Sequence, residues 1–196
     1  MKYKINYQKN YQLGGGGSGG GGGENFSKEK LNKTLIFIAN LLINNSIDDW
    51  FIAYGTLLGI IREDSCIDQD DDVDIMIKET YYDKVKSLLI DNGIEIEYGY
   101  EIGNSKNIIK TLTNKEYVTV DFYMCNINDK GDFYNKWDKF TYSNCYDNNK
   151  KLIKYNWNNI ELQIPNNSKT KLEKIYGPEW HIKQKKNSYK RITNIF

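Results

Sequence analysis

Apolar residues recur at spacings of three and four in three segments of the chain, which predicts three helices with one buried face each. The segments begin at Ser27, at the capping box Thr80-x-x-Asp83 and at about Ser168. The apolar stripe of the first consists of Leu31, Leu35, Ile38 and Leu42. Asn92-Gly93 ends the second helix, and Tyr176-Gly177-Pro178 ends the third, because glycine commonly terminates a helix and proline cannot continue one.

Short runs of β-branched and aromatic residues predict strands between and after these helices. The runs cover residues 50–54, 73–77, 94–100, 107–113, 117–124, 152–155 and 160–164, the last two flanking a turn at Asn158-Asn159. Residues 126–150 are polar and rich in Tyr and Asn, so we predict a loop with short elements there. Helices and strands alternate, which predicts an α/β (α+β) domain with a small mixed β-sheet flanked by helices.

The N-terminal part of the chain has a different character. Gly14 to Gly23, interrupted only by Ser18, has the composition of an engineered flexible linker and no capacity to form a core. Residues 1–13 alternate in polarity, so they are either an edge strand or a tethered peptide. We therefore expect the functional domain within residues 24–196.

Composition excludes several classes of protein. The 196 residues are 39% hydrophobic and 27% charged, with a formal net charge of +1, which gives no electrostatic reason to expect DNA binding. Cys66, Cys125 and Cys145 have no CxxC spacing, so reduced thiols are expected rather than disulfides or a zinc site. No apolar stretch reaches the roughly 18–20 residues of a membrane span and the start lacks a signal-peptide pattern, so we expect a cytoplasmic protein.

The most informative strand is acidic. Side chains alternate across a strand, so Val73, Ile75 and Ile77 can pack on the core while Asp72 and Asp74 point together to the opposite face. Two carboxylates roughly 6 Å apart repel each other by about 3 kcal/mol at an effective dielectric constant near 20. A hard divalent cation, Mg²⁺ or Mn²⁺, would offset this repulsion.

A second strand repeats the arrangement. Val118, Val120 and Phe122 form its core face, and Asp121 lies on the other face, in a strand of β-branched and aromatic residues where Asp is uncommon. We infer that Asp121 completes the cluster with Asp72 and Asp74, either as a third metal ligand or as a general base.

The acidic run has two other interpretations. Asp68 and Asp71 are typical of a solvated loop, whereas Asp72 and Asp74 are embedded among apolar residues. A calcium-binding EF-hand loop starting at Asp68 would require Gly at its sixth position, which is Val73.

A glycine turn precedes the acidic strand. Gly55-Thr56 follows the predicted strand at 50–54 and opens an apolar segment, so backbone N–H groups at this turn could bind a phosphate. Arg62 ends the segment and is either a phosphate ligand or a surface residue. We predict Gly55, Thr56 and Arg62 as nucleotide-binding residues.

The string Tyr54-Gly55-Thr56-Leu57-Leu58-Gly59, followed by Arg62, Ile67 and Asp70 to Met76, resembles the LicD family, which includes the fukutin-related proteins of the nucleotidyltransferase superfamily. Tyr176-Gly177-Pro178-Glu179-Trp180 is similar to the C-terminal segment of that family. The resemblance covers about residues 28–182. One departure is Asp68-Gln69, where the family usually has Pro-Trp, which affects the loop shape and the donor selectivity.

The resemblance implies that Asp72 and Asp74 hold the metal and that the Gly-Thr turn faces the nucleotide. The implied reaction transfers a phosphorylated group, such as phosphocholine or phosphoribitol, from a CDP-linked donor to a hydroxyl of a glycan or small-molecule acceptor. Alternatives are a nucleotidyltransferase that uses a nucleoside triphosphate to modify a small molecule, protein or RNA, a metal-dependent glycosyltransferase, and an inactive nucleotide-binding module.

Overall fold

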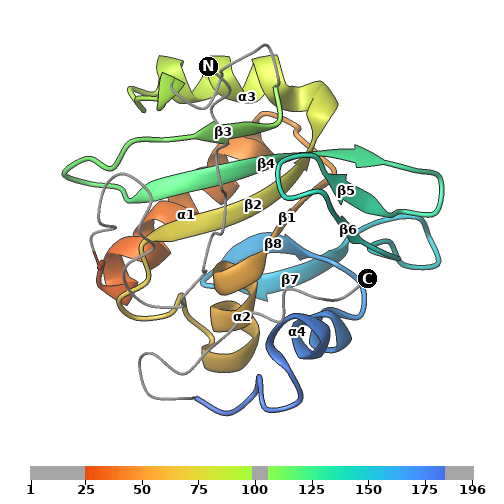
Figure 1. Ribbon diagram of the computed structural model, residues 1–196. Helices are drawn as coiled ribbons and strands as arrows, with labels where there is room; N and C mark the ends of the chain where they lie inside the picture. The colour runs from red at the N-terminus through yellow and green to blue at the C-terminus, as the bar shows by residue number, and fades with distance from the viewer. Residues whose placement is uncertain (1–24, 99–105, 184–196) are drawn as a thin grey trace, which may run out of the picture.

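The computed structural model describes residues 25–98 and 106–183. The predictions for residues 1–13 and for the Gly/Ser linker at 14–23 lie outside this part of the chain. A mixed sheet forms the centre of the described domain, with helices on both sides of it (Figure 1). The α/β class predicted from the alternation of elements is confirmed.

The first helix, α1 (Lys28–Asn44), forms where the apolar stripe predicts it. Its N-cap is Ser27, whose hydroxyl accepts a hydrogen bond from the Lys30 amide at 3.4 Å. The helix is followed by β1 (Trp50–Ile52) and α2 (Tyr54–Glu63). The predicted strand at 50–54 is thus too long at its C-terminal end, because Tyr54 is already the first residue of α2.

The central strands of the main sheet are β2 (Asp72–Lys78) and β4 (Thr119–Ile127), which are parallel neighbours. On its outer side β2 pairs with β1 in antiparallel orientation. The other edge of β4 pairs first with β3 (Ile108–Lys110) and then with β5 (Phe133–Asn135), and β5 continues to β6 (Phe140–Tyr142). A separate hairpin consists of β7 (Ile153–Trp157) and β8 (Ile160–Ile164), joined at Asn158-Asn159 as predicted.

The helix after β2 begins differently from the prediction. A 3₁₀ turn, η1 (Glu79–Tyr81), precedes α3 (Tyr82–Asp91), whose N-cap is Tyr81 and has no side-chain capping bond. The predicted capping box Thr80-x-x-Asp83 is therefore wrong, because the 3₁₀ turn moves the start of the α-helix beyond Thr80. The last helix, α4 (Ser168–Tyr176), ends at Gly177, which has a φ of 87°.

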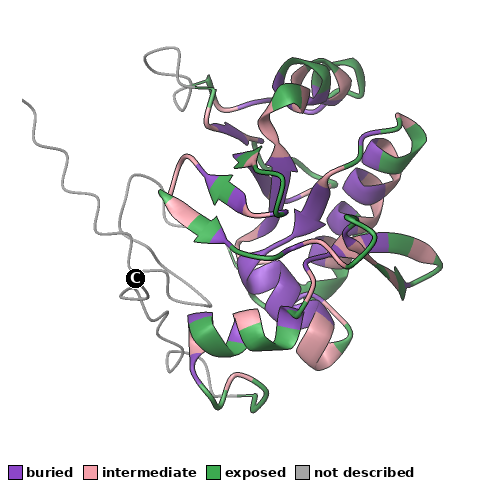
Figure 2. Ribbon diagram, turned by 90° about the vertical axis from the view of Figure 1, so that its right-hand side faces the viewer, coloured by how far each residue is buried: buried purple, intermediate pink, exposed green. Residues whose placement is uncertain are grey.

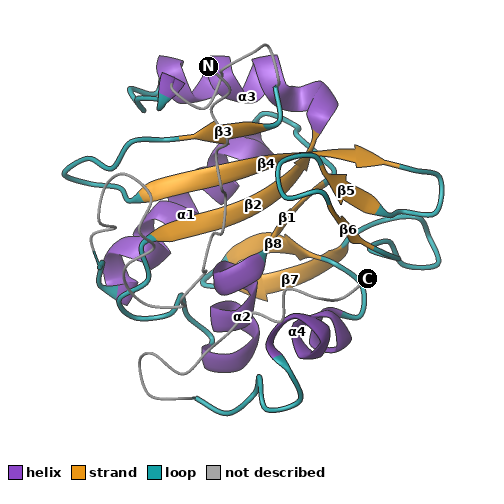
Figure 3. Ribbon diagram, viewed as in Figure 1, coloured by secondary structure: helices purple, strands orange, loops and turns teal. Residues whose placement is uncertain are grey.

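Residues 126–150 form a loop with short elements, as predicted, and these elements are the three-residue strands β5 and β6, which join the main sheet (Figure 3). One further prediction needs correction. The run at 94–100 was expected to be a strand, whereas in its described part only an isolated bridge between Ile96 and Thr111 forms. Strand pairing, which depends on the partner, overrides the local pattern here.

Alternation along β2 and β4 divides the core into two faces. One face carries Val73, Ile75, Ile77, Val120 and Phe122 and packs with apolar residues of α1 and α3. The opposite face carries Met76, Tyr123 and Cys125 and packs with Phe51, Phe133 and Tyr142. Figure 2 shows that the central strands are almost entirely buried. Polar side chains on these strands are therefore held away from bulk water.

No helix in the described ranges is both long enough and apolar enough to cross a membrane.

Candidate active site

The structure brings Asp74 and Asp121 side by side. They are register partners on the parallel strands β2 and β4, and only 6% and 1% of their respective surfaces are exposed. Partners directly opposite each other in a sheet project to the same face. Two carboxylates that lie 47 positions apart in the sequence thus form the floor of one site.

Two other side chains contact this pair. The Tyr123 hydroxyl donates a hydrogen bond to Asp74 Oδ1 at 3.2 Å and lies 3.5 Å from Asp121 Oδ2. The Lys110 ammonium, which projects from β3, lies 3.6 Å from Asp121 Oδ1. The site therefore combines carboxylates with a phenol and one positive charge.

The N-terminal end of β2 carries further acidic residues. The carboxylate oxygens of Asp70, Asp71 and Asp72 lie within 4.8 Å of one another, and Asp70 is buried. Burial and then the charge of Asp71 raise the pKa of Asp70 to about 7. These three residues, and not the combination of Asp72 with Asp74 and Asp121, form the tightest group of possible metal ligands in the described part of the chain.

Burial also raises the pKa of Asp72 well above its usual range, and nearby negative charges raise it further. In order of effect, these charges belong to Asp74, Asp121, Asp71 and Asp70. The acidic residues of β2 and β4 therefore act on one another as a single electrostatic cluster. We call Asp70, Asp71, Asp72, Asp74 and Asp121 the carboxylate cluster.

The glycine turn lies directly beside this cluster. The Ala53 amide donates to the Asp74 carbonyl oxygen at 3.0 Å, and the Asp74 amide donates to Thr56 Oγ1 at 2.9 Å. Both backbone groups of Asp74 are thus bound by the start of α2. The first turn of a helix leaves N–H groups without helical partners and carries partial positive charge, so the turn at Gly55-Thr56 is suited to bind an anion next to Asp74.

Tyr54 holds the start of α2 against the β5–β6 hairpin. Its φ of 44° is unusual for a residue with a side chain. The Tyr54 hydroxyl donates to Asp138 Oδ2 at 2.8 Å and accepts a hydrogen bond from Asn135 Nδ2 at 3.1 Å, and its ring packs edge-on against Tyr123 at 5.3 Å. These contacts keep the backbone of the turn in a strained conformation beside the carboxylates.

Gly59 has a packing role in the middle of α2. A Cβ atom at this position would lie 2.5 Å from the Ser65 carbonyl oxygen and 2.9 Å from the Ile67 amide nitrogen. Glycine thus allows the loop that leads into the acidic strand to approach the helix closely.

Arg62 lies at the other end of α2, about 9 Å along the helix axis from Thr56 at 1.5 Å per residue. Its guanidinium donates two hydrogen bonds to the neighbouring Glu63, with which it forms an ion pair, and a third to the Trp180 carbonyl oxygen at 3.5 Å. The structure therefore places the Gly55-Thr56 turn beside Asp74, and Arg62 lies at the opposite end of α2. Its role as a nucleotide ligand stays a prediction.

The chemistry of the cluster fits a divalent cation. Its donors are carboxylate oxygens, which Mg²⁺ and Mn²⁺ prefer, and after burial the neighbouring negative charges add to the rise in the pKa of Asp72. Asp72 and Asp74 would hold such an ion, with Asp121 and Asp70 close by.

Four residues of the site were not predicted from the sequence, and one of them, Asp71, was assigned to a solvated loop. Asp70 has the same strand parity as Asp72 and Asp74, so the alternation itself could have indicated it. Tyr123 shares the parity of Asp121, two positions away. Lys110 has no local signal, because only the pairing of β3 with β4 places it opposite Asp121.

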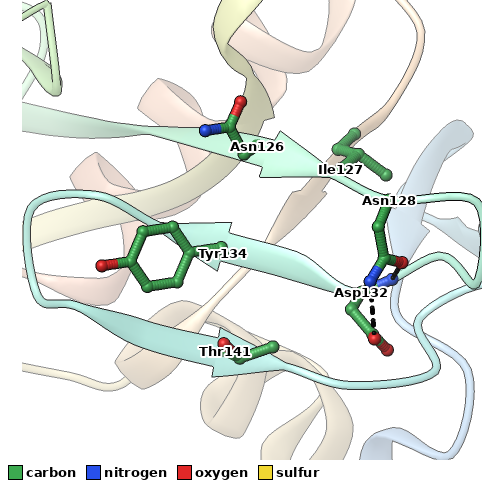
Figure 4. Close-up of a pocket in the computed structure, with 6 residues that line it drawn as sticks. All are labelled: Asn126, Ile127, Asn128, Asp132, Tyr134 and Thr141. Atoms are coloured by element: carbon green, nitrogen blue, oxygen red, sulfur yellow. Dashed lines mark hydrogen bonds between the residues drawn. The ribbon is translucent and has the colours of Figure 1, made fainter.

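An open cavity of about 440 Å³ lies elsewhere on the sheet (Figure 4). Asn126, which lines it, is five positions after Asp121 on β4, so it faces away from the carboxylates. Asn128 and Asp132, also in its lining, bind each other and the backbone of their own turn. Their polar atoms thus build the hairpin, and we assign no ligand to this cavity.

Comparisons with known proteins agree with this geometry. The sequence model of the LicD/FKTN/FKRP nucleotidyltransferase domain matches residues 48–167, which include every residue of the carboxylate cluster. The crystal structure of the lincosamide antibiotic adenylyltransferase LnuA, bound to lincomycin, has a similar fold. Its TM-score is 0.51 at 17% sequence identity, over 72% of this chain and 81% of that one. This likeness confirms the nucleotidyltransferase-like fold. No curated protein sequence matches the chain.

Proposed function

Because the chain belongs to the LicD/FKTN/FKRP nucleotidyltransferase family, whose members transfer nucleotidyl or phosphate-type groups, we propose that it is a metal-dependent phosphotransferase. Its donor is a CDP-linked compound that carries phosphocholine or phosphoribitol, and its acceptor is a glycan hydroxyl. The observation that carries this proposal is the placement of Asp74 and Asp121 side by side, next to the N-terminus of α2.

The residues of the site have separate roles in this reaction. Asp72 and Asp74 would hold Mg²⁺ or Mn²⁺, with Asp121 as a further ligand, and the ion would neutralise charge on the donor phosphates. The N–H groups at Gly55-Thr56 bind a phosphate oxygen and orient the donor. The acceptor oxygen forms a bond to the transferred phosphorus, and the bond from that phosphorus to CMP breaks. Asp121, when it is not bound to the metal, is placed to take the proton of the acceptor hydroxyl.

A second candidate is nucleotidyl transfer to a small-molecule hydroxyl. It is favoured by the name of the structural neighbour, an adenylyltransferase with a comparable fold. The same carboxylates would then act on a nucleoside triphosphate, and the reaction would release pyrophosphate. A transferase that uses a CDP-linked donor releases CMP, so analysis of the products distinguishes the two.

Thermal unfolding with nucleotides tests the proposal. The protein is heated with CTP, CDP-choline, ATP, UTP or a UDP-sugar, each with and without Mg²⁺ or Mn²⁺. A ligand at 100 times its dissociation constant adds about 2.7 kcal/mol of stability, which is roughly 5–10 °C for a domain of this size. We expect this shift with cytidine nucleotides and only in the presence of the metal.

Two double variants make the result specific. Asp72→Asn/Asp74→Asn should lose the metal-dependent shift, whereas Asp91→Asn/Asp129→Asn, which removes two exposed carboxylates far from the cluster, should keep it. A shift with ATP alone would favour the adenylyltransferase candidate. No shift with any nucleotide would contradict both enzymatic proposals and would leave an inactive module.

A further inference from the structure

Lys110 extends the row of charged residues that crosses the sheet. It is the register partner of Asp121 on β3, as Asp74 is the register partner of Asp121 on β2. The row Lys110, Asp121, Asp74 therefore lies on one face of three adjacent strands. It begins with an ammonium and continues with two buried carboxylates.

The exposure of this pair is asymmetric. The Asp121 side chain is 1% exposed, whereas that of Lys110 is 21% exposed, and the Lys110 ammonium lies 3.6 Å from Asp121 Oδ1. The Lys110 side chain thus joins a buried carboxylate to the solvent. An ion pair between exposed groups contributes little, but here the Asp121 partner is shielded from water, so the attraction between Lys110 and Asp121 is stronger than in an exposed pair.

A lysine side chain can bind two different anions in succession. Its charge is compact and is carried on a flexible stem of four carbons, so the ammonium can move to a new anion without displacement of the backbone. A divalent cation bound to the cluster would compete with the ammonium for Asp121. An ammonium released in this way would stay next to the metal, where a donor phosphate bound to that metal would also lie.

We propose that Lys110 balances the charge of Asp121 while the cluster holds no metal, and that it binds a phosphate of the nucleotide donor once a metal is present. This inference rests on the proposed function, because it assigns a further residue to the same site. It makes Lys110 a donor-binding residue whose effect on metal binding is opposite in sign to its effect on nucleotide binding.

The test uses the variant Lys110→Met, which removes the charge and keeps most of the aliphatic stem. Binding of Mn²⁺ alone is measured from the electron paramagnetic resonance signal of the free ion. Binding of CDP-choline and of CTP is then measured by calorimetry at saturating Mn²⁺. We expect Mn²⁺ to bind about tenfold more tightly to the variant, and the nucleotide to bind about tenfold more weakly.

Two further variants serve as controls. Lys106→Met removes an ammonium that pairs with Asp83 on the surface, four positions before Lys110, and should change neither affinity. Lys110→Arg keeps the positive charge and should retain most of the nucleotide affinity. If Lys110→Met fails to fold, as judged by circular dichroism, the comparison of Lys110→Gln with Lys110→Arg replaces it.

The outcomes separate the inference from the proposed function. Weaker Mn²⁺ binding in Lys110→Met would mean that Lys110 only supports the geometry of Asp121, and unchanged nucleotide affinity would mean that it does not bind the donor. Either result overturns the inference and leaves the proposed function standing. If the unaltered protein binds neither Mn²⁺ nor any of the nucleotides, the proposed function fails and the inference fails with it.

Discussion

The hydroxyl group of Tyr123 joins two carboxylates on neighbouring strands. It donates to Asp74 Oδ1 at 3.2 Å and lies 3.5 Å from Asp121 Oδ2, and the residue is fully buried. Groups that hydrogen-bond to metal ligands fix the orientation of these ligands. Removal of such a group typically weakens metal binding by 10- to 100-fold. Tyr123 is therefore a positioning residue of the proposed metal site.

We predict that Tyr123→Phe weakens Mn²⁺ binding by about tenfold and lowers the free energy of unfolding by about 1 kcal/mol. Metal titration and denaturant unfolding check the two values. Tyr146→Phe is the matched control, because it removes a hydroxyl that donates to Asp49 Oδ1 at 2.7 Å, and it should leave metal binding unchanged. Equal Mn²⁺ affinities in the unaltered protein and Tyr123→Phe would exclude the positioning role.

At the scale of secondary-structure elements, the site depends on how α2 meets β2. The Thr56 hydroxyl accepts a hydrogen bond from the Asp74 amide at 2.9 Å, and Thr56 is only 2% exposed. Along the edge of β2, this bond lies just beyond the position where the pairing with β1 ends. The position of the helix N-terminus relative to the carboxylates is therefore determined by one side chain of the Gly-Thr turn.

We predict that Thr56→Val, which keeps the shape of the side chain, destabilises the protein by about 1–3 kcal/mol, because the buried Asp74 amide loses its acceptor. Nucleotide binding should weaken at the same time, since the N-terminus of α2 is no longer held beside the metal ligands. Denaturant unfolding and calorimetry measure the two effects. Thr56→Ser retains the hydroxyl and should be close to the unaltered protein, so a loss of equal size in Thr56→Ser would disprove this explanation.

At the scale of the whole molecule, the carboxylates of the cluster repel one another in the folded protein when they are ionised. Burial raises the pKa of Asp70 to about 7 and that of Asp72 well above its usual range. A carboxyl group with a raised folded-state pKa stabilises the fold fully below its unfolded pKa of about 4, and this stabilisation is lost as the pH rises through the folded value. By contrast, Glu63, Asp132 and Asp147 have lowered pKa values, so their contributions are lost only in stronger acid.

We therefore predict that the protein in a metal chelator unfolds at a lower temperature at pH 8 than at pH 5.5, by about 5 °C. Saturating Mg²⁺ at pH 8 should remove most of this difference, because the cation neutralises the ionised carboxylates. Calorimetric unfolding at the two pH values measures both effects, and Asp70→Asn should reduce the dependence on pH. An unfolding temperature in chelator that is the same at pH 5.5 and pH 8 would contradict the proposed repulsion.

Much of this arrangement could be predicted from local patterns. The stripe from Leu31 to Leu42 determines α1, and the alternation around Asp72 and Asp74 determines which of their neighbours face the core. The capping box at Thr80 failed because a 3₁₀ turn competes with it. Short elements were predicted within residues 126–150, but the pairing of β5 with β4 and of β6 with β5 was not, because it depends on residues outside each local pattern. Local sequence patterns indicate which face of a helix or strand is buried, but they do not indicate which element packs or pairs with it.

The same physical limit applies to the site. The sequence by itself determined the acidic strand, the glycine turn before it and the separate Asp121, because strand alternation and helix N-termini are local properties. Only the tertiary structure decided that Asp121 is the partner of Asp74, that Lys110 lies opposite Asp121 and that Arg62, at the C-terminal end of α2, pairs with Glu63. These relations follow from strand register and from the direction of α2, which are set by the packing of the whole core.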